Sequence, residues 1–278
     1  MGNMGYEDWD PAPRRLMGAI VGDIVGSIYE HDNIHTTDFE LFGSGCFITD
    51  DSVMTLAVAQ ALTKAKQNPR LTVYDEIVDC MRSFGRHYPY VGYGKRFIDW
   101  LWSDEPKPYN SWGNGAPMRC SAAGWITQDV DKAAALGALT AEPTHNHPYA
   151  IAAASTVAGM ICMARKGHSK RELWDYAQSK GYAIPTMQWL RDNYEYTESS
   201  QGTMPAALAC FLHSASFEDS LRKAISIGGD SDTIAAITGS IAEAYYTVPD
   251  DIRQKAWTYL PINLRKVLVE FNGTFNLW

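Results

Sequence analysis

Apolar residues recur at helical spacing along almost the entire chain, and this pattern restricts the fold more than any other feature of the sequence. Residues 14–29 predict a helix with one buried stripe, formed at intervals of four by Leu16, Ile20, Ile24 and Ile28. Runs that alternate between apolar and polar residues, as strands do, are absent from the sequence. We therefore expect an all-α fold, a compact multi-helix bundle. Its further helices are predicted over residues 52–66, 72–86, 94–103, 131–141, 147–165, 169–180, 204–214, 217–226, 233–246, 250–258 and 262–271.

The first predicted helix also carries a glycine at every fourth position, at Gly18, Gly22 and Gly26. An interior glycine costs about 0.5–1 kcal/mol relative to alanine, so this series predicts that another backbone approaches closely. Residues 147–165 and 232–244 are also built largely from small side chains. We expect these segments at the centre of the bundle, with the helix over 52–66 beside them.

The sequence shows no linker, internal repeat or low-complexity tract. We expect a single domain over residues 14–278, preceded by a flexible segment over residues 1–13.

Charge and composition narrow the class of protein. A net charge of −8 without any run of lysine and arginine argues against binding to nucleic acid. Five scattered cysteines without a Cys-x-x-Cys pair predict a reduced, cytoplasmic setting rather than disulfides or a thiolate metal site. No apolar run reaches the roughly 18–20 residues of a membrane span, and the polar amino end is unlike a signal peptide or a lipid-anchor signal.

Acidic and hydroxyl residues stand directly ahead of two of the apolar helices. The groups are Thr49, Asp50 and Asp51 before one helix, and Asp230, Asp232 and Thr233 before the other. Their oxygen atoms are hard ligands that suit Mg²⁺, Mn²⁺ or Ca²⁺.

For either group alone, helix capping is the simpler interpretation, because Asp, Ser and Thr are preferred N-caps. Together, the two groups favour a metal centre, since burying several carboxylates without a counter-ion costs several kcal/mol each. Arg119 is the cation that folding could bring to them.

Four further features are candidates for a site. Glu30 stands where the helix over 14–29 ends, a position that opposes the helix dipole, so a metal, a substrate or plain solvation must account for it. The segment "WGNG" (112–115) could present main-chain N–H groups to an anion or could be an ordinary turn. His145 and His147 could be a pair of zinc ligands, but their spacing and the absence of a third ligand make that a weak candidate. Alone, His145 is more simply a hydrogen-bonded cap of the following helix. Tyr93 and Phe97 could stack on a base, although core packing is the simpler interpretation.

Five segments carry a resemblance to a known family. In order they read "GAIVGDIVGSIYE", "FITDDSVMTLAVAQAL", "WGNGAPMR", "TAEPTHNHPYAIAAA" and "IGGDSDTIAAITGSIAEAYY". They resemble the signature segments of the ADP-ribosylglycohydrolases over about residues 14–247. The resemblance implies a compact all-α fold, two Mg²⁺ or Mn²⁺ ions as cofactors, and removal of ADP-ribose from modified proteins.

The resemblance also implies roles for particular residues. Its metal ligands are Thr49, Asp50, Asp51, Asp230, Asp232 and Thr233. Catalytic roles fall to Glu30, Asp50, Asp51 and Asp232, with Glu30 or an aspartate as general base. The diphosphate and ribose are held by Gly113, Asn114, Gly115, Met118, Arg119 and His145.

We therefore expect a metal-dependent hydrolase that cleaves the bond between ADP-ribose and a protein side chain. Its partners would be an ADP-ribosylated protein and ADP-ribose, with no nucleic acid and no membrane. A non-catalytic ADP-ribose or partner binder, or a nucleotide-diphosphate phosphohydrolase, remains an alternative. The stretch 185–201 could be a lid or specificity loop, and residues 248–278 carry no motif that we can place.

Overall fold

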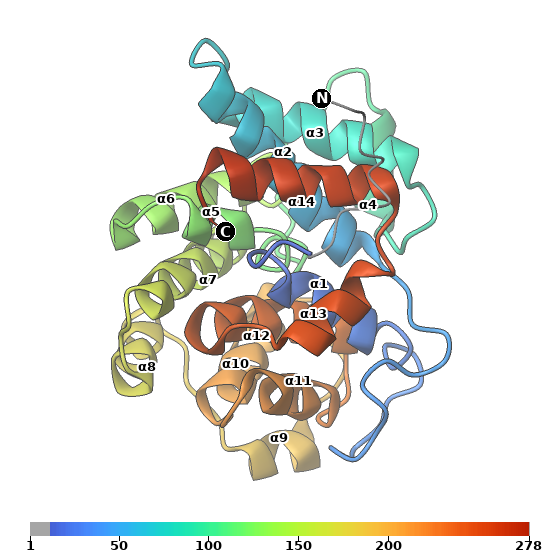
Figure 1. The fold of residues 1–278 in the computed structure, drawn as a ribbon, viewed down its shortest axis with the longest axis vertical. Helices are drawn as coiled ribbons and strands as arrows, with labels where there is room; N and C mark the ends of the chain where they lie inside the picture. Colours follow the sequence, from blue (N-terminus) through green and yellow to red (C-terminus); the bar gives the residue numbers. More distant parts are fainter. Residues whose placement is uncertain (1–11, 278) are drawn as a thin grey trace.

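The glycine-spaced segment forms helix α1 (Gly18–Gly26), which lies against helix α12 (Ser231–Tyr246) in the middle of the molecule (Figure 1). A Cβ atom placed on Gly18 would lie 2.2 Å from the carbonyl oxygen of Gly239, and one on Gly22 would lie 2.1 Å from that of Ala235. No side chain fits at such distances, so the predicted approach of another backbone is confirmed.

The structure, a computed structural model, describes residues 12–277 and contains fourteen helices in that range. It contains no strand there, and one isolated bridge joins Gly113 and Ser199. The predicted all-α fold is confirmed. Besides α1 and α12, the helices are α2 (Asp50–Gln67), α3 (Val73–His87), α4 (Lys95–Trp102), α5 (Ser121–Trp125), α6 (Val130–Ala141), α7 (Pro148–Arg165), α8 (Lys170–Ser179), α9 (Met187–Asn193), α10 (Ser200–Leu212), α11 (Phe217–Ile225), α13 (Asp250–Trp257) and α14 (Ile262–Thr274).

Two helices were not predicted, and both are short. Helix α5 has 5 residues and α9 has 7, too few to display a helical period. Helix α9 occupies part of the stretch 185–201, for which the sequence suggested a lid or specificity loop.

Helix α1 is shorter than the predicted helix over residues 14–29. The carboxylate of Glu243, on α12, accepts hydrogen bonds from the main-chain N–H groups of Met17 and Gly18 at 3.1 and 2.9 Å and so caps the start of α1. Its end follows from local hydrogen bonds: the Ser27 hydroxyl donates to a carbonyl within the last turn, and the chain then bends. The interpretation of Glu30 as a helix terminus is therefore wrong, because α1 ends at Gly26 and Glu30 lies beyond the turn that follows it.

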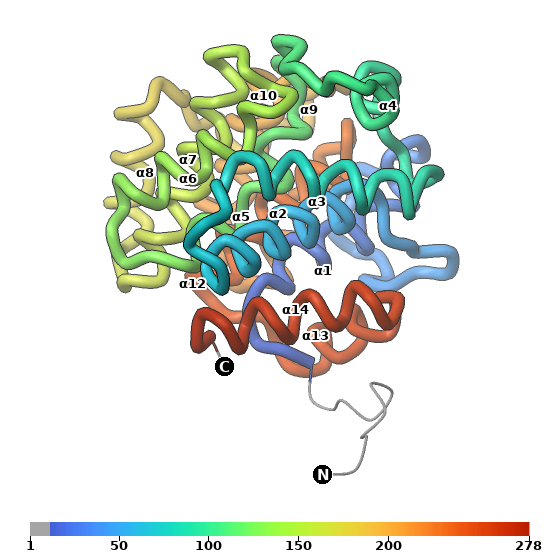
Figure 2. Tube along the Cα trace, turned by 90° about the horizontal axis from the view of Figure 1, so that it is seen from above, coloured from blue at the N-terminus to red at the C-terminus, as the bar shows by residue number. Residues whose placement is uncertain are grey.

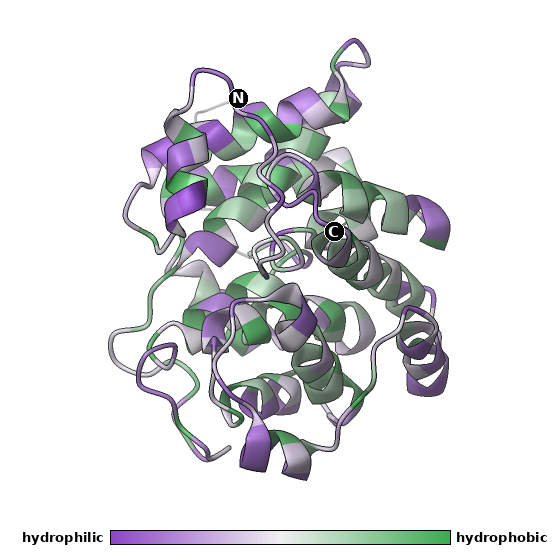
Figure 3. Ribbon diagram, turned by 180° about the vertical axis from the view of Figure 1, so that it is seen from behind, coloured by the Kyte–Doolittle hydropathy of each residue, from purple (hydrophilic) through white to green (hydrophobic). Residues whose placement is uncertain are grey.

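The other helices surround the α1–α12 pair (Figures 1 and 2). Helix α2 contacts both, with α3 and α14 packed on its outer side, while α7, α10 and α11 pack on α12. The alanine-rich helix α7 admits other backbones closely, since a Cβ atom on Gly137 of α6 would lie 2.5 Å from the carbonyl oxygen of Ala154. Polar residues gather on the outer turns and loops (Figure 3), and the core of apolar side chains is continuous through the centre.

Within residues 248–278, where the sequence carries no motif, the two predicted helices form as α13 against α1 and α14 across α2. The Asn272 side chain fixes this region by bonding the main-chain N–H and carbonyl of Arg15 at 3.2 and 3.1 Å. Most of the segment 1–13 lies outside the described residues; Ala12 and Pro13 are buried. The five cysteines are free and buried. No helix within residues 12–277 has the length and apolar character needed to cross a membrane.

Candidate active site

A cavity of about 570 Å³ opens where α2 and α12 begin. Segments far apart in the sequence form its wall, and all the residues to which the resemblance assigns a role lie in it. They are Glu30, Thr49, Asp50, Asp51, Gly113, Asn114, Gly115, Met118, Arg119, His145, Asp230, Asp232 and Thr233. Their roles stay predictions, but the fold does bring them together.

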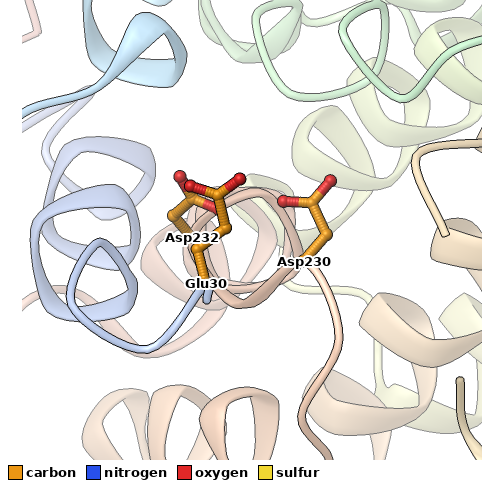
Figure 4. A group of neighbouring side chains, drawn as sticks. All are labelled: Glu30, Asp230 and Asp232. Carbon is orange, nitrogen blue, oxygen red and sulfur yellow. The ribbon is translucent and has the colours of Figure 1, made fainter. Parts of the chain in front are cut away.

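At the start of α12, Asp230 faces into this cavity rather than capping the helix, whereas Asp232 accepts from the Thr233 main-chain N–H at 2.9 Å. Asp230 occupies the N-cap position of α12 but makes no side-chain cap hydrogen bond. Its carboxylate instead accepts a hydrogen bond of 2.6 Å from the Asn114 side-chain amide. Glu30, Asp230 and Asp232 each have a carboxylate oxygen within 4.8 Å of the others (Figure 4). This group could hold a metal ion.

The acidic group at the start of α2 combines both interpretations. Thr49 is the N-cap of α2, and its hydroxyl accepts from the main-chain N–H of Asp51 at 3.3 Å. One carboxylate oxygen of Asp51 accepts a hydrogen bond of 3.0 Å from the Thr233 hydroxyl, which joins the two acidic groups. The other, Oδ1, is buried without a partner in the described structure. A buried, unpartnered carboxylate oxygen is a ligand atom that suits a cation.

Asp23 is a residue of this region that the sequence analysis missed. It lies on α1, is fully buried, and accepts hydrogen bonds from the Thr49 hydroxyl at 2.7 Å and from the Ser52 main-chain N–H at 3.0 Å. In the sequence it is a single acid within an apolar helix, and no spacing signal links it to residue 49.

Burial and mutual repulsion raise the pKa values of these acids. The pKa of Asp50 rises to about 8, because of burial first and then the carboxylates of Asp23 and Asp230. Burial likewise raises the pKa values of Asp51 and Asp232 well above their usual range, with neighbouring carboxylates as the next cause. A bound divalent cation would reverse this effect by favouring the ionised forms.

Protein cations do not neutralise the five aspartates. The ion pairs of the described residues bring no lysine or arginine to them. Arg119, which folding could have brought to them, donates instead to the Thr140 carbonyl at 3.1 Å and to the Thr144 hydroxyl at 2.8 Å. Among residues 12–277, no lysine or arginine therefore forms an ion pair with these aspartates, although Arg119 lines the same cavity.

The glycine-containing loop lines the same cavity as the acids. A Cβ atom on Gly113 or Gly115 would lie 3.3 or 3.2 Å from His145 Nε2, so the loop presents its main chain where a side chain would crowd the imidazole. The side chain of Asn114 turns the other way and bonds Asp230 and Thr203. The loop thus places its main chain beside His145 and one side chain on Asp230.

His145 belongs to a hydrogen-bonded chain with Thr144 and Arg119. Its Nδ1 lies 2.7 Å from the Thr144 hydroxyl, which also accepts from Arg119. Because Arg119 can only donate, the Thr144 hydroxyl can donate to Nδ1, and in that arrangement the proton of neutral His145 is on Nε2. Burial holds the pKa of His145 well below its usual range. The cap of α7 is His147, whose Nδ1 accepts from the Tyr149 main-chain N–H at 3.2 Å.

Comparison with known proteins now identifies the family. The sequence model of the ADP-ribosylglycohydrolases matches residues 14–268. The chain belongs to the ADP-ribosylglycohydrolase family. It is 27% identical to the human ADP-ribosylhydrolase ARH3, over 88% of each chain. It is 25% identical to the ADP-ribosylarginine hydrolase Tri1 of Pseudomonas putida, over 90% of this chain and 75% of that one. With the ADP-ribosyl-[dinitrogen reductase] glycohydrolase of Rhodospirillum rubrum it shares 25% identity over 87% of each.

A solved structure described as an ADP-ribosylglycohydrolase-related protein complex shares the fold, with a TM-score of 0.68 and 22% identity over 93% of this chain and 95% of that chain.

The cavity is also lined by aromatic residues that the sequence analysis did not single out. Phe47, Tyr90 and Tyr196 line it with exposed rings. The two aromatic candidates of the sequence differ: both Tyr93 and Phe97 are buried, with ring centroids 5.0 Å apart, but only Phe97 also reaches the cavity wall. Aromatic residues are common in this chain, so their sequence positions carried no signal for the rim.

The stretch 185–201 closes one side of the cavity. The Glu198 carbonyl accepts from the Asn114 main-chain N–H at 2.7 Å, and the Ser200 main-chain N–H donates to the Trp112 carbonyl at 2.9 Å. These bonds fasten the stretch to the glycine-containing loop. Tyr196 and Glu198 face the cavity from it and bond each other at 3.2 Å.

Proposed function

We propose that this protein is a cation-dependent hydrolase that releases ADP-ribose from a modified protein side chain or a related ADP-ribosyl conjugate. The observation that carries the proposal is the convergence of uncompensated carboxylates with a main-chain-lined glycine loop in one cavity. The ADP-ribosyl hydrolase names of the family relatives support the same substrate.

The acidic groups fit two divalent cations, Mg²⁺ or Mn²⁺. The residues that would hold them are Thr49, Asp50, Asp51, Asp230, Asp232 and Thr233, with Glu30 adjacent. Asp51 Oδ1 has no hydrogen-bond partner, and no lysine or arginine among the described residues forms an ion pair with the aspartates. A cation would give this oxygen a partner and balance the charge of the aspartates. When bound, such ions polarise a water molecule and hold sugar hydroxyls.

The part of the wall that carries the glycine-containing loop and His145 would hold the diphosphate and the ribose. The main chain at Gly115 would face the anionic oxygens, because the N–H groups of Gly113 and Asn114 already donate to the Ser111 hydroxyl and the Glu198 carbonyl. Neutral His145 would donate from Nε2, because the Thr144 hydroxyl, which accepts from Arg119, occupies its other nitrogen. Arg119, fixed by the carbonyl of Thr140, adds a positive charge at the wall without pairing with the acids.

Glu30 is the side chain we propose as general base. Burial and the nearby Asp230 raise its pKa, and a raised pKa makes a carboxylate a stronger base. In the reaction the bond from C1″ of the ribose to the side-chain nitrogen or oxygen breaks, and the oxygen of water takes its place. The water proton leaves through the base, and the leaving group gains a proton.

A single assay tests the proposal. The protein is incubated with ADP-ribosyl-arginine, ADP-ribosyl-serine and free ADP-ribose, each with Mg²⁺, Mn²⁺ or EDTA. Release of ADP-ribose that EDTA stops is the expected result. Release of AMP would instead mean a phosphohydrolase, and saturable binding without turnover would mean a binding protein.

A matched variant separates cation-site acids from ordinary helix-start acids. Asp251 is an exposed aspartate in the first turn of α13, outside the cavity, so Asp251→Asn should keep full activity. Asp50→Asn should not.

A further inference from the structure

Asp23 lies directly behind the acidic group at the start of α2, although it belongs to α1. Its side chain does not line the cavity and is fully buried. Its Oδ2 accepts from the main-chain N–H groups of Thr49 and Ser52, both at 3.0 Å, and its Oδ1 accepts from the Thr49 hydroxyl at 2.7 Å. Every one of these partners donates, so the carboxylate fits the site as an acceptor only.

These contacts fix the direction of the Thr49 hydroxyl. Its proton points to Asp23, so its lone pairs point elsewhere. One accepts the main-chain N–H of Asp51 at 3.3 Å, and Thr49 also forms part of the cavity wall. A divalent cation binds to an oxygen lone pair, so a hydroxyl serves as a ligand only when its proton is turned away from the ion.

We propose that Asp23 is a positioning residue of the cation site: it turns the Thr49 hydroxyl proton away from the cavity and fixes the start of α2, so that Thr49 and Asp51 face the cation. The role rests on the proposed cation-dependent function. A buried group that holds a metal ligand in position typically changes metal affinity by about 10- to 100-fold.

The substitution Asp23→Asn tests this role, because it keeps the shape of the side chain and replaces one of its two acceptor oxygens by a donor NH₂ group. The amide NH₂ group cannot face the main-chain N–H of Ser52, since both would donate. It must therefore face Thr49, where only the hydroxyl can reverse and accept. The reversed hydroxyl then directs its proton toward the cavity.

Glu243 provides a matched control. It is another buried carboxylate, and it too accepts two main-chain N–H groups at a helix start, those of Met17 and Gly18, but it lies outside the cavity wall. Glu243→Gln should cost stability comparably and leave cation affinity within about 2-fold of wild type.

The measurement is calorimetric titration of wild type, Asp23→Asn and Glu243→Gln with MnCl₂ and MgCl₂, below the melting temperature of each protein. We expect Asp23→Asn to bind the cation about 10- to 100-fold more weakly. In a Thr49→Val background, which lacks the hydroxyl, Asp23→Asn should lose much of its effect.

The outcomes separate the role of Asp23 from the proposed function. Unchanged cation affinity in Asp23→Asn, or an equal loss in Glu243→Gln, would overturn the positioning role. Weaker binding confined to Asp23→Asn supports the role, even if the wild type binds the cation and releases no ADP-ribose, a result that would overturn the proposed function alone. A wild type that binds neither cation would overturn both.

Discussion

The two acidic groups look alike in the sequence, and the fold uses them differently. At the start of α2, Thr49 caps the helix, and a carboxylate from α1 supports the cap from behind. At the start of α12, Asp230 caps nothing and is instead held by the amide of Asn114. In the first group, the Asp23 carboxylate accepts from the Thr49 hydroxyl and so orients it. In the second group, the Asn114 amide donates to the Asp230 carboxylate and so orients it. An Asp/Thr cluster before a helix can therefore be a cap, a ligand set or both, and its neighbours from other helices decide which.

The largest expected effect lies in the second group. Asp232→Asn removes a carboxylate whose pKa is raised by burial and by Asp51 and Asp230. We expect hydrolysis to fall by more than about 100-fold, beyond the loss typical of a supporting residue. With EDTA the variant should melt no lower than wild type, because a buried like charge is gone, and Mg²⁺ should no longer raise its melting temperature. Wild-type turnover in this variant would contradict the cation site.

The support of the second group gives the next largest effect. Asn114→Ala removes the 2.6 Å hydrogen bond to Asp230, and we expect about 10- to 100-fold weaker cation binding by calorimetry. Asn114→Asp should be worse, because it sets a carboxylate against Asp230. If Asn114→Asp binds the cation better than Asn114→Ala, the amide is not what orients Asp230.

A third change tests whether α1 ties the two groups together. A Cβ atom on Gly26 would lie 2.4 Å from the Cα atom of Asp232, so Gly26→Ala must displace the start of α12. We expect a loss of about 1–3 kcal/mol in the free energy of unfolding, measured by urea titration. Gly94→Ala is the control, because nothing lies within 4 Å of its Cβ position and its φ is −61°. Equal stability of the two variants would show that α1 and α12 can separate.

The smallest expected effect is a pH dependence of the cation-free protein. Asp50 has its pKa raised from 3.8 to about 8, so the folded state holds a proton there that the unfolded chain releases. Its contribution to stability is complete below 3.8 and is lost as the pH rises through about 8. In EDTA the melting temperature should therefore fall between pH 5 and pH 9, and saturating Mg²⁺ should flatten the curve. A melting temperature that rises over this interval in EDTA would contradict the raised pKa.

The sequence itself determined the helices, because helical periodicity is a local property, and the approach of α1 to its neighbour, because three interior glycines cost stability unless a backbone fills the space. It also located the acidic groups and the glycine-containing loop, since their residue types stand out against an apolar background. Short helices such as α5 and α9 escaped, as they complete too few turns to show a period.

Only the tertiary structure decided which group supports which. Asp23 and Thr49 are 26 residues apart, and Asn114 and Asp230 are 116 apart. No local pattern encodes either pair, because a hydrogen bond depends on distance and direction in space, and those are set by how α1, α2 and α12 pack. The same packing directs Arg119 to Thr140 and Thr144 instead of into an ion pair with the acids.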